Sequence, residues 1–107
     1  MEQLLPRQLA DWLADPGREQ PLLLDVREEW EYELCHLPDS QHIPMHLVPI
    51  RCGELPAARD IVVICHHGAR SMQVAMFLER KGFSALHNLT GGIDAWTSEV
   101  DRSLRRY

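Results

Sequence analysis

The sequence feature that most constrains the fold is an unbroken apolar run from Ile61 to Cys65, followed directly by a loop that contains glycine. β-branched residues fill this run up to its final cysteine. Such a run is typical of a strand that is buried on both faces, as in a parallel sheet covered by helices. The sequence therefore predicts a layered α/β structure with this strand inside it.

Shorter patterns on either side of this run alternate between strand and helix. Further strands are predicted at 22–26, 41–43 and 85–89. Helices are predicted from Pro6 to a stop at Pro16-Gly17, at 28–34, at 71–81 and at 93–100, with a less regular helical stretch at 45–55. This alternation predicts a mostly parallel sheet. Ligands of such sheets bind beyond the carboxyl ends of the strands, where Asp25 and Cys65 both fall.

Length and charge limit the classes of function. The 107 residues are enough for one domain over 1–107 and too few for two comfortable ones. The formal net charge is −5, and Lys81 is the only lysine among 11 basic residues. A nucleic-acid binder would carry a basic stripe, so nucleic acid is not an expected partner. The local excess at Arg102, Arg105 and Arg106 is interpreted as a solvated helix end.

Neither a membrane span nor a secretory leader is expected. No apolar run approaches the roughly 20 residues that cross a bilayer, and the segment after Met1 lacks the apolar core of a signal peptide. The three cysteines are odd in number and widely spaced, which argues against a disulfide framework. A reducing, cytoplasmic setting is therefore predicted.

The segment expected to carry the chemistry joins the buried strand to the next helix and reads Cys65, His66, His67, Gly68, Ala69, Arg70, Ser71. At such a junction the first amides of the helix lack partners and favour an anion. Gly68 permits a tight turn, and Arg70 adds a permanent cation. Such surroundings lower the pKa of a thiol from about 8.5 to roughly 3.5–7.5, so Cys65 is predicted to react as a thiolate. The alternative, a cysteine that only ends a buried strand, is disfavoured by the Gly, Arg and Ser that follow at fixed offsets.

This loop resembles the active loop of the rhodanese family, Cys-x-x-Gly-x-Arg-Ser. Three other stretches agree with the family in the same order: Leu24-Asp25-Val26-Arg27, His36-Leu37-Pro38 with His42-Ile43-Pro44, and Leu89-Thr90-Gly91-Gly92-Ile93-Asp94-Ala95-Trp96. The likeness covers about residues 5 to 100. It departs from the family at Cys35, where the family has Gly, and at Asp39-Ser40, where it has Gly-Ala. The resemblance implies a rhodanese-like α/β domain whose central, mostly parallel sheet of about five strands has helices on both faces.

The resemblance also implies a sulfurtransferase that works in two half-reactions through a persulfide on Cys65. A small donor such as thiosulfate would supply the sulfur. Cyanide in an assay, or a thiol that a protein can carry, would accept it. The substrate-binding loop, His66 to Ser71, would surround the terminal sulfur with main-chain amides. No metal or organic cofactor is required.

Residues beside the loop are interpreted as structural. Asp25 and Arg27 are predicted to support the site as an ion pair or loop brace rather than to react. Trp96 and the Gly91-Gly92 pair are interpreted as packing and turn elements.

Six histidines raise the question of a metal site. Adjacent residues such as His66 and His67 seldom converge on one ion, and we expect them to point towards the entrance and to tune the donor or acceptor. Pro44 interrupts the i, i+4 interval between His42 and His46, which spoils a helical pair of ligands. No metal site is therefore predicted.

Other functions stay open. A phosphatase or arsenate reductase of the Cys-x5-Arg type needs five intervening residues, whereas four separate Cys65 from Arg70. A non-catalytic binding module of the same fold usually lacks the cysteine. A persulfide carrier that hands sulfur to a protein partner needs the same loop, so the sequence does not separate it from an enzyme with small substrates. Cys35 and Cys52 are interpreted as inert, at least partly buried thiols, with the alternative that one of them resolves an oxidised Cys65.

Overall fold

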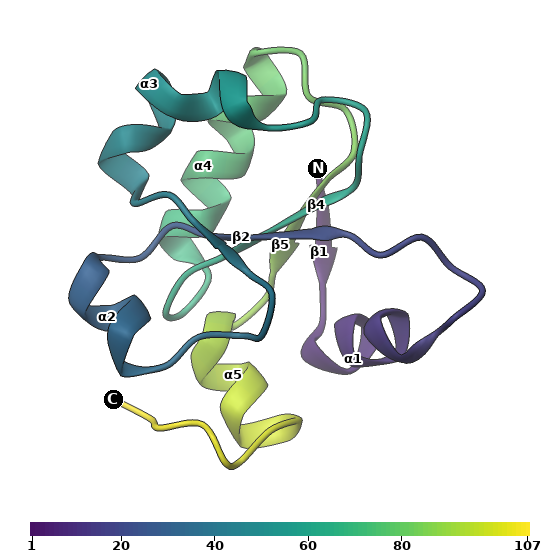
Figure 1. Ribbon diagram of the computed structural model, residues 1–107, viewed down its shortest axis with the longest axis vertical. Coiled ribbons are helices and arrows are strands. Elements are labelled where there is room, and N and C mark those ends of the chain that lie inside the picture. The colour runs from purple at the N-terminus through teal and green to yellow at the C-terminus, as the bar shows by residue number, and fades with distance from the viewer.

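A five-stranded, entirely parallel sheet forms the centre of the computed structural model, which describes residues 1–107 (Figure 1). The strands lie in the order β1-β5-β4-β2-β3. Their bounds are β1 Glu2–Leu4, β2 Leu22–Asp25, β3 Gln41–His42, β4 Ile61–Ile64 and β5 Leu86–Leu89. All four residues of β4 are fully buried, because strands lie on both sides of it and helices cover both faces. The predicted central strand is therefore confirmed.

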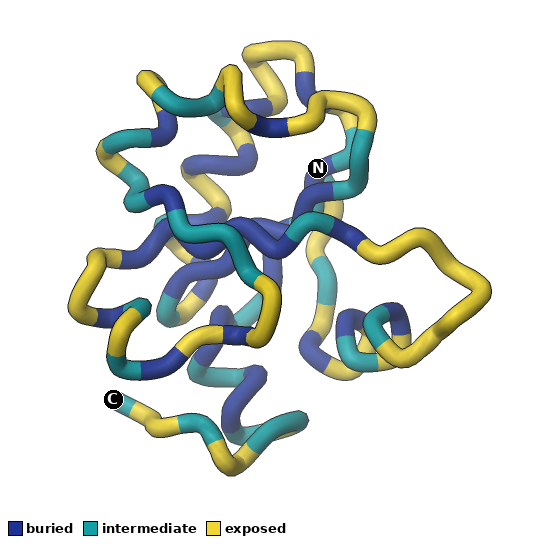
Figure 2. Tube along the Cα trace, viewed as in Figure 1, coloured by how far each residue is buried: buried dark blue, intermediate teal, exposed yellow.

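Helices cover the two faces of the sheet, and the predicted fold class is confirmed. They are α1 Pro6–Ala14, α2 Glu29–Leu34, α3 Val48–Arg51, α4 Ala69–Arg80 and α5 Gly92–Glu99. Val62 and Ile64 point into a core shared with α1 and α5, whereas Ile61, Val63 and Cys65 point into a second core shared with α3 and α4. Figure 2 shows the buried residues concentrated in the sheet and on the inner sides of the helices.

Glycines mark both ends of α4. Gly68 precedes the helix with a φ of 103°, in the left-handed region that favours glycine, and Gly82 follows it with a φ of 99°. The helix begins at Ala69, two residues earlier than predicted. As a result, the loop after β4 is short, and the first turn of α4 lies directly beside Cys65.

Two elements differ from the sequence-based expectation. The edge strand β1 was not predicted, because its three residues alternate too briefly to show a period and face largely outwards. It pairs with β5, so that Glu2 lies opposite His87. The helical stretch predicted at 45–55 consists of a 3-10 turn at Met45–Leu47, α3, and a second 3-10 turn at Cys52–Glu54.

The segment after α5 turns back alongside α5 towards α2 instead of continuing the helix. Figure 1 shows the C-terminal end beside α2. The interpretation of Arg102, Arg105 and Arg106 as a helix end is wrong, since α5 stops at Glu99. Arg106 forms a 3.0 Å ion pair with Asp94 of α5.

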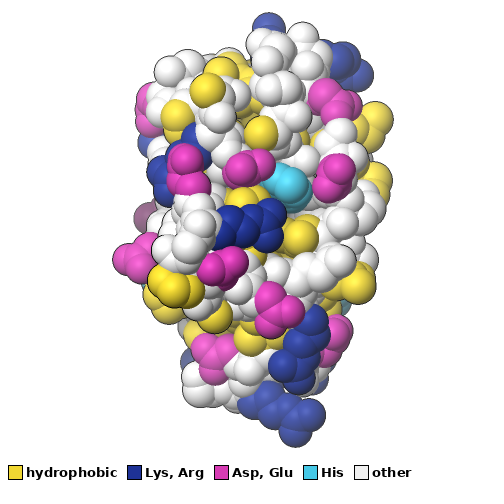
Figure 3. Space-filling model, turned by 90° about the vertical axis from the view of Figure 1, so that its right-hand side faces the viewer, with side chains coloured by type: hydrophobic (Ala, Val, Ile, Leu, Met, Phe, Trp, Pro, Cys, Tyr) yellow, Lys and Arg dark blue, Asp and Glu magenta, His cyan; other side chains and the backbone are white.

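Charged side chains of both signs are mixed on the face shown in Figure 3, where acidic groups surround basic ones and no large patch of one sign forms. None of the helices is both long and apolar enough to pass through a bilayer.

Candidate active site

Cys65 follows β4 directly and is 1% exposed. Its Sγ accepts a 3.0 Å hydrogen bond from the backbone N–H of Gly68 and lies 3.2 Å from the hydroxyl oxygen of Ser71. The N–H groups of Ala69, Arg70 and Ser71 have no acceptor within the chain, as is usual in the first turn of a helix. The start of α4 therefore offers one bonded and three unpaired amides beside the sulfur, an arrangement that favours negative charge.

The Gly91-Gly92 turn leads into backbone groups that bind the carbonyls of this loop. The N–H of Ile93 donates to the carbonyl of Cys65 at 2.8 Å, and the N–H of Asp94 donates to the carbonyl of His66 at 3.1 Å. A Cβ at Gly92 would overlap both of these carbonyl oxygens, and Gly92 also has a φ of 62°. The predicted turn is confirmed, and through it the first turn of α5 binds two carbonyls of the loop.

Arg70 does not contact Cys65 through a hydrogen bond. Its two terminal nitrogens donate to the two carboxylate oxygens of Glu31 at 2.7 and 2.9 Å, in the bidentate geometry that suits a guanidinium. The pairing with Glu31 raises the pKa of Arg70, and the charge of Cys65 contributes to a smaller extent. The cation predicted for the loop thus lies close to the cysteine but is already neutralised by an acid from α2.

Glu31 connects the loop to the rest of the site. Its side chain is 4% exposed and accepts a 2.6 Å hydrogen bond from the Tyr107 hydroxyl in addition to the two from Arg70. Burial by itself would raise the pKa of this carboxyl, but the hydrogen bonds from Arg70 and Tyr107 outweigh burial and lower the pKa to about 2. Glu31 is therefore an anion at neutral pH, placed between α2, α4 and the C-terminal segment.

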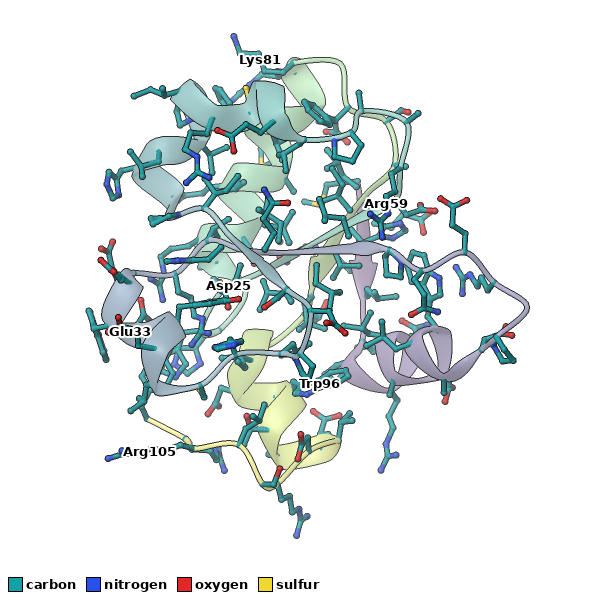
Figure 4. The ribbon with its side chains drawn as sticks, viewed as in Figure 1. Asp25, Glu33, Arg59, Lys81, Trp96 and Arg105 are labelled. Carbon is teal, nitrogen blue, oxygen red and sulfur yellow. The ribbon has the colours of Figure 1, made fainter.

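Asp25 and Arg27 form the predicted ion pair, with Arg27 Nη2 2.7 Å from Asp25 Oδ2 and both side chains buried. Arg27 also donates to the carbonyls of Cys35 at 2.6 Å and Glu31 at 3.2 Å. Burial opposes the charge of Arg27, but the contacts with Asp25 prevail and raise its pKa. This pair joins the end of β2 to α2, the helix that supplies Glu31; Figure 4 shows Asp25 at this end of β2.

His66 and His67 differ in their surroundings. The His66 ring stacks on Tyr107 with centroids 3.8 Å apart, and its Nε2 lies 3.0 Å from the main-chain oxygen of Tyr107. Burial, together with the nearby His67, lowers the pKa of His66. His67 is exposed, as expected of a residue at the entrance, and its Nδ1 lies 3.9 Å from Asp94 Oδ2. His66 is instead covered by the C-terminal residue.

Three residues of this site were not predicted: Glu31, Asn88 and Tyr107. Glu31 carried a weak signal, because an acid one helical turn beyond Arg27 can reach the same region. Asn88 carried a clearer one, since a polar residue in a buried strand needs partners. Tyr107 carried none, because its contacts with residues 27 and 31 span 76 or more positions in the sequence.

Two other histidines pack on a tyrosine ring. His36 and His42 stack on the two faces of the Tyr32 ring, at centroid distances of 4.0 and 4.4 Å. No group of three or more His, Cys, Asp and Glu side chains is arranged to hold a metal ion. Cys35 is buried and Cys52 is partly buried, as predicted, and all three cysteines are free thiols.

One cavity lies away from Cys65. It has a volume of about 570 Å³, and its walls include Leu22, Arg59 and Trp96. Leu22 begins β2 and Arg59 precedes β4, so this cavity opens at the amino ends of the strands, opposite the cysteine. Figure 4 shows Arg59 and Asp25 at opposite ends of the sheet.

A family model described as "Rhodanese-like domain" matches residues 5–99 of the chain. The chain belongs to the rhodanese-like family. The match covers nearly all of the chain, so the cysteine loop and the three other stretches of the likeness all lie within the rhodanese domain.

Some relatives of this rhodanese domain match it over most of their own length. A "Sulfurtransferase" from Allochromatium vinosum is 44% identical over 82% of this chain and 80% of its own. A "Thiosulfate sulfurtransferase GlpE" from Pseudomonas syringae pv. syringae is 33% identical over 86% of this chain and 84% of its own. The crystal structure of a rhodanese-like domain protein from Staphylococcus aureus has a TM-score of 0.85 at 25% identity, covering 100% of this chain and 99% of that one. Rhodanese-type sulfur transfer is therefore the class of activity supported for this domain.

Proposed function

We propose that this rhodanese domain moves a sulfane sulfur from a small donor such as thiosulfate to a thiol, or to cyanide in an assay, through a persulfide on Cys65. The observation that carries the proposal is the 3.0 Å hydrogen bond from the Gly68 N–H to Cys65 Sγ, beside the unpaired amides of the first turn of α4. Amide donors that are already in place stabilise a negatively charged sulfur without reorganisation.

The first half-reaction is a displacement at sulfur. The Cys65 thiolate attacks the outer sulfur of thiosulfate, the S–S bond of the donor breaks, and sulfite leaves with the electron pair. The new persulfide carries its negative charge on the terminal sulfur, where the amides at residues 68–71 would bind it. In the second half-reaction, the acceptor attacks that terminal sulfur and Cys65 leaves as a thiolate. Atoms and electrons balance without a further reactant.

The paired charges around the loop would act as positioning groups. Arg70 and Glu31 hold the first turn of α4 against α2, and Asp25 and Arg27 hold α2 against β2. Because each of the two arginines has a carboxylate partner, the two ion pairs add little net charge to the site. In this proposal the amides, rather than a free guanidinium, are the main partners of the anionic sulfur.

Intact-mass measurement after brief exposure to thiosulfate tests the proposal. We expect the protein to gain the mass of one sulfur atom and to lose it when cyanide is added. Cys65→Ser should abolish the gain, whereas the matched control Cys52→Ser, at a half-buried thiol far from the loop in sequence, should retain it. A gain that persists in Cys65→Ser, or no gain in the wild-type protein with any sulfane sulfur donor, would refute the assignment.

A persulfide carrier that serves a protein acceptor is the second candidate. One observation favours it: the Trp30 side chain is 61% exposed and lies edge-on against Tyr107, which contacts His66 of the loop. Exposed tryptophans are typical anchors of protein interfaces. Steady-state turnover separates the two candidates, since slow turnover with cyanide combined with a stable persulfide indicates a carrier.

We place the protein in the cytoplasm as part of this proposal. Its three cysteines are free thiols, which suits a reducing compartment. A persulfide that passes to cellular thiols also requires such an environment. Fractionation of cells that express the protein from its own promoter tests the location.

A further inference from the structure

Asn88 is a buried polar residue of the central sheet that the proposed mechanism leaves without a role. It lies on β5 and is 2% exposed. Its Oδ1 accepts a hydrogen bond from the Ser71 hydroxyl, whose oxygen lies 3.2 Å from Cys65 Sγ. Its Nδ2 donates to the Gly68 carbonyl at 3.3 Å and to Gln3 Oε1 at 3.0 Å. Asn88 therefore contacts both residues whose polar groups meet the sulfur.

The acceptors around Asn88 determine which way its amide faces. The Gly68 carbonyl can only accept, so the group beside it must be the NH2 group. Gln3 Oε1, which also accepts from the Thr90 hydroxyl at 2.9 Å, takes the second proton of the same group. The remaining atom is an oxygen that faces Ser71 and cannot donate. Ser71 must therefore supply the proton of the bond between them.

Ser71 has one hydroxyl proton, and Asn88 accepts it. The Ser71 oxygen then offers only lone pairs to Cys65, an arrangement that suits a thiol donating its S–H. An anionic sulfur needs the opposite arrangement, because it accepts hydrogen bonds and donates none. To serve an anionic sulfur, the Ser71 hydroxyl must rotate towards Sγ and give up its bond to Asn88. Ser71 keeps its proton throughout, and the thiol proton leaves to solvent.

We propose that Asn88 is a positioning residue that competes with the Cys65 sulfur for the hydroxyl proton of Ser71. This competition favours the thiol in the resting site and releases the hydroxyl to the sulfur once the sulfur is anionic. The inference rests on the proposed role of Cys65 as nucleophile. It concerns a residue on β5 that takes no part in the two sulfur-transfer steps proposed above. If the competitor is removed, the Ser71 proton can bond the anionic sulfur without a rival.

The charged and titratable groups near the loop are engaged elsewhere. Those on the elements packed against it are Asp25 and Arg27 after β2, Glu31 on α2, Arg70 on α4, His66 and His67 in the loop, His87 on β5, Asp94 on α5, and Arg106 and Tyr107 in the C-terminal segment. Asn88 has no hydrogen bond to any of them. A change at residue 88 therefore leaves these pairs intact.

The test is the rate at which iodoacetamide alkylates Cys65 as a function of pH, followed on the Cys65 peptide by mass spectrometry. Asn88→Leu keeps the branched shape but removes the acceptor. We expect it to move the midpoint of the profile to lower pH by about 0.5–1 unit, which makes alkylation below the midpoint about 3–10-fold faster. Ser71→Ala should move the midpoint to higher pH, because the anion loses a donor. In the Ser71→Ala background, Asn88→Leu should have no effect.

Asn88→Asp provides a second arm, which also serves if circular dichroism shows that Asn88→Leu is unfolded. This substitution keeps an oxygen towards Ser71 and makes that oxygen a stronger acceptor. The midpoint of the alkylation profile should therefore move to higher pH, and it should move further when residue 71 is serine than when it is alanine. The proposal is overturned if Asn88→Leu leaves the midpoint unchanged, if its effect is the same in both backgrounds, or if Leu and Asp act in the same direction. Alkylation needs no sulfur donor, so these outcomes are distinct from a failure to form a persulfide with thiosulfate.

Discussion

The amide nitrogen of Ile93 lies 2.8 Å from the carbonyl oxygen of Cys65, so the first turn of α5 holds the residue proposed as nucleophile by its main chain. The approach is close because Gly92, just before Ile93, has no Cβ. Two helix starts thus meet at one loop: α5 binds its carbonyls, and α4 offers its amides to the sulfur.

Gly92→Ala should disrupt this contact. The new Cβ would overlap the carbonyl oxygens of Cys65 and His66, and the left-handed backbone alone costs about 1–3 kcal/mol for a residue with a side chain. We expect a lower free energy of unfolding in urea and a loss of persulfide formation. Gly53→Ala is the matched control, since nothing lies within 4 Å of its Cβ position and it should behave as the wild type. Equal stability of the two variants would show that the close approach is unimportant.

Asp25→Ala should be among the most destabilising single changes. It leaves the Arg27 guanidinium buried without its carboxylate, a situation that costs about 3–5 kcal/mol. Urea denaturation measures this loss. The exposed pair of Arg51 and Glu54 supplies the comparison, because Glu54→Ala breaks an ion pair in solvent and should leave stability nearly unchanged. Similar losses in both variants would contradict the assigned role of Asp25.

Stability should depend on the ionisation of Glu31 at acid pH. Its pKa is lowered from an ordinary value of 4.5 to about 2, so its ionised form stabilises the fold above about pH 4.5, and this contribution is lost as the pH falls towards 2. The difference in unfolding free energy between the wild type and Glu31→Gln should therefore shrink over this window. Glu33→Gln, at an exposed position on the same helix, should show no such trend. A constant difference between pH 7 and pH 2.5 would rule out the effect.

Tyr107→Phe should weaken the contact between the C-terminal segment and the site. The hydroxyl donates to Glu31 and accepts from Arg27 Nη1 at 3.0 Å, and its loss leaves two buried side chains each short of one hydrogen bond. We expect a loss of about 1–3 kcal/mol in the free energy of unfolding, measured by denaturant titration. Arg105→Ala changes an exposed residue of the same segment and should be neutral. A Tyr107→Phe protein as stable as the wild type would mean that the hydroxyl adds nothing.

Local patterns were sufficient to predict the centre of the fold. The run from Ile61 to Ile64 could be buried only between other strands, and Gly68 with Arg70 and Ser71 indicated the loop and the helix after it. Side chains whose partners are near in sequence, such as Asp25 and Arg27, were also predicted to pair, and they do.

Contacts between distant parts of the chain could not be predicted in this way. Glu31 meets Arg70 across 39 positions, and its spacing from Arg27 was only a weak signal among the acids of α2. Asn88 could be recognised as a polar residue in a buried strand, but its partner Gln3 lies on a strand too short to show a period. The sequence placed the Arg70 cation in the same loop as Cys65, but it did not show the Glu31 carboxylate that neutralises this cation.

Because the two cores described above lie on opposite faces of the sheet, they fix which residues of β4 face each side. Alternate residues of this strand enter opposite layers, and residue 65 belongs to the layer of α4. Inserting or deleting a single residue within 61–64 would turn the cysteine towards α1 and α5 and bring its neighbour to the amides instead. The position of the reactive group thus depends on the number of residues in β4. Insertions and deletions should therefore be tolerated least within the apolar run 61–64.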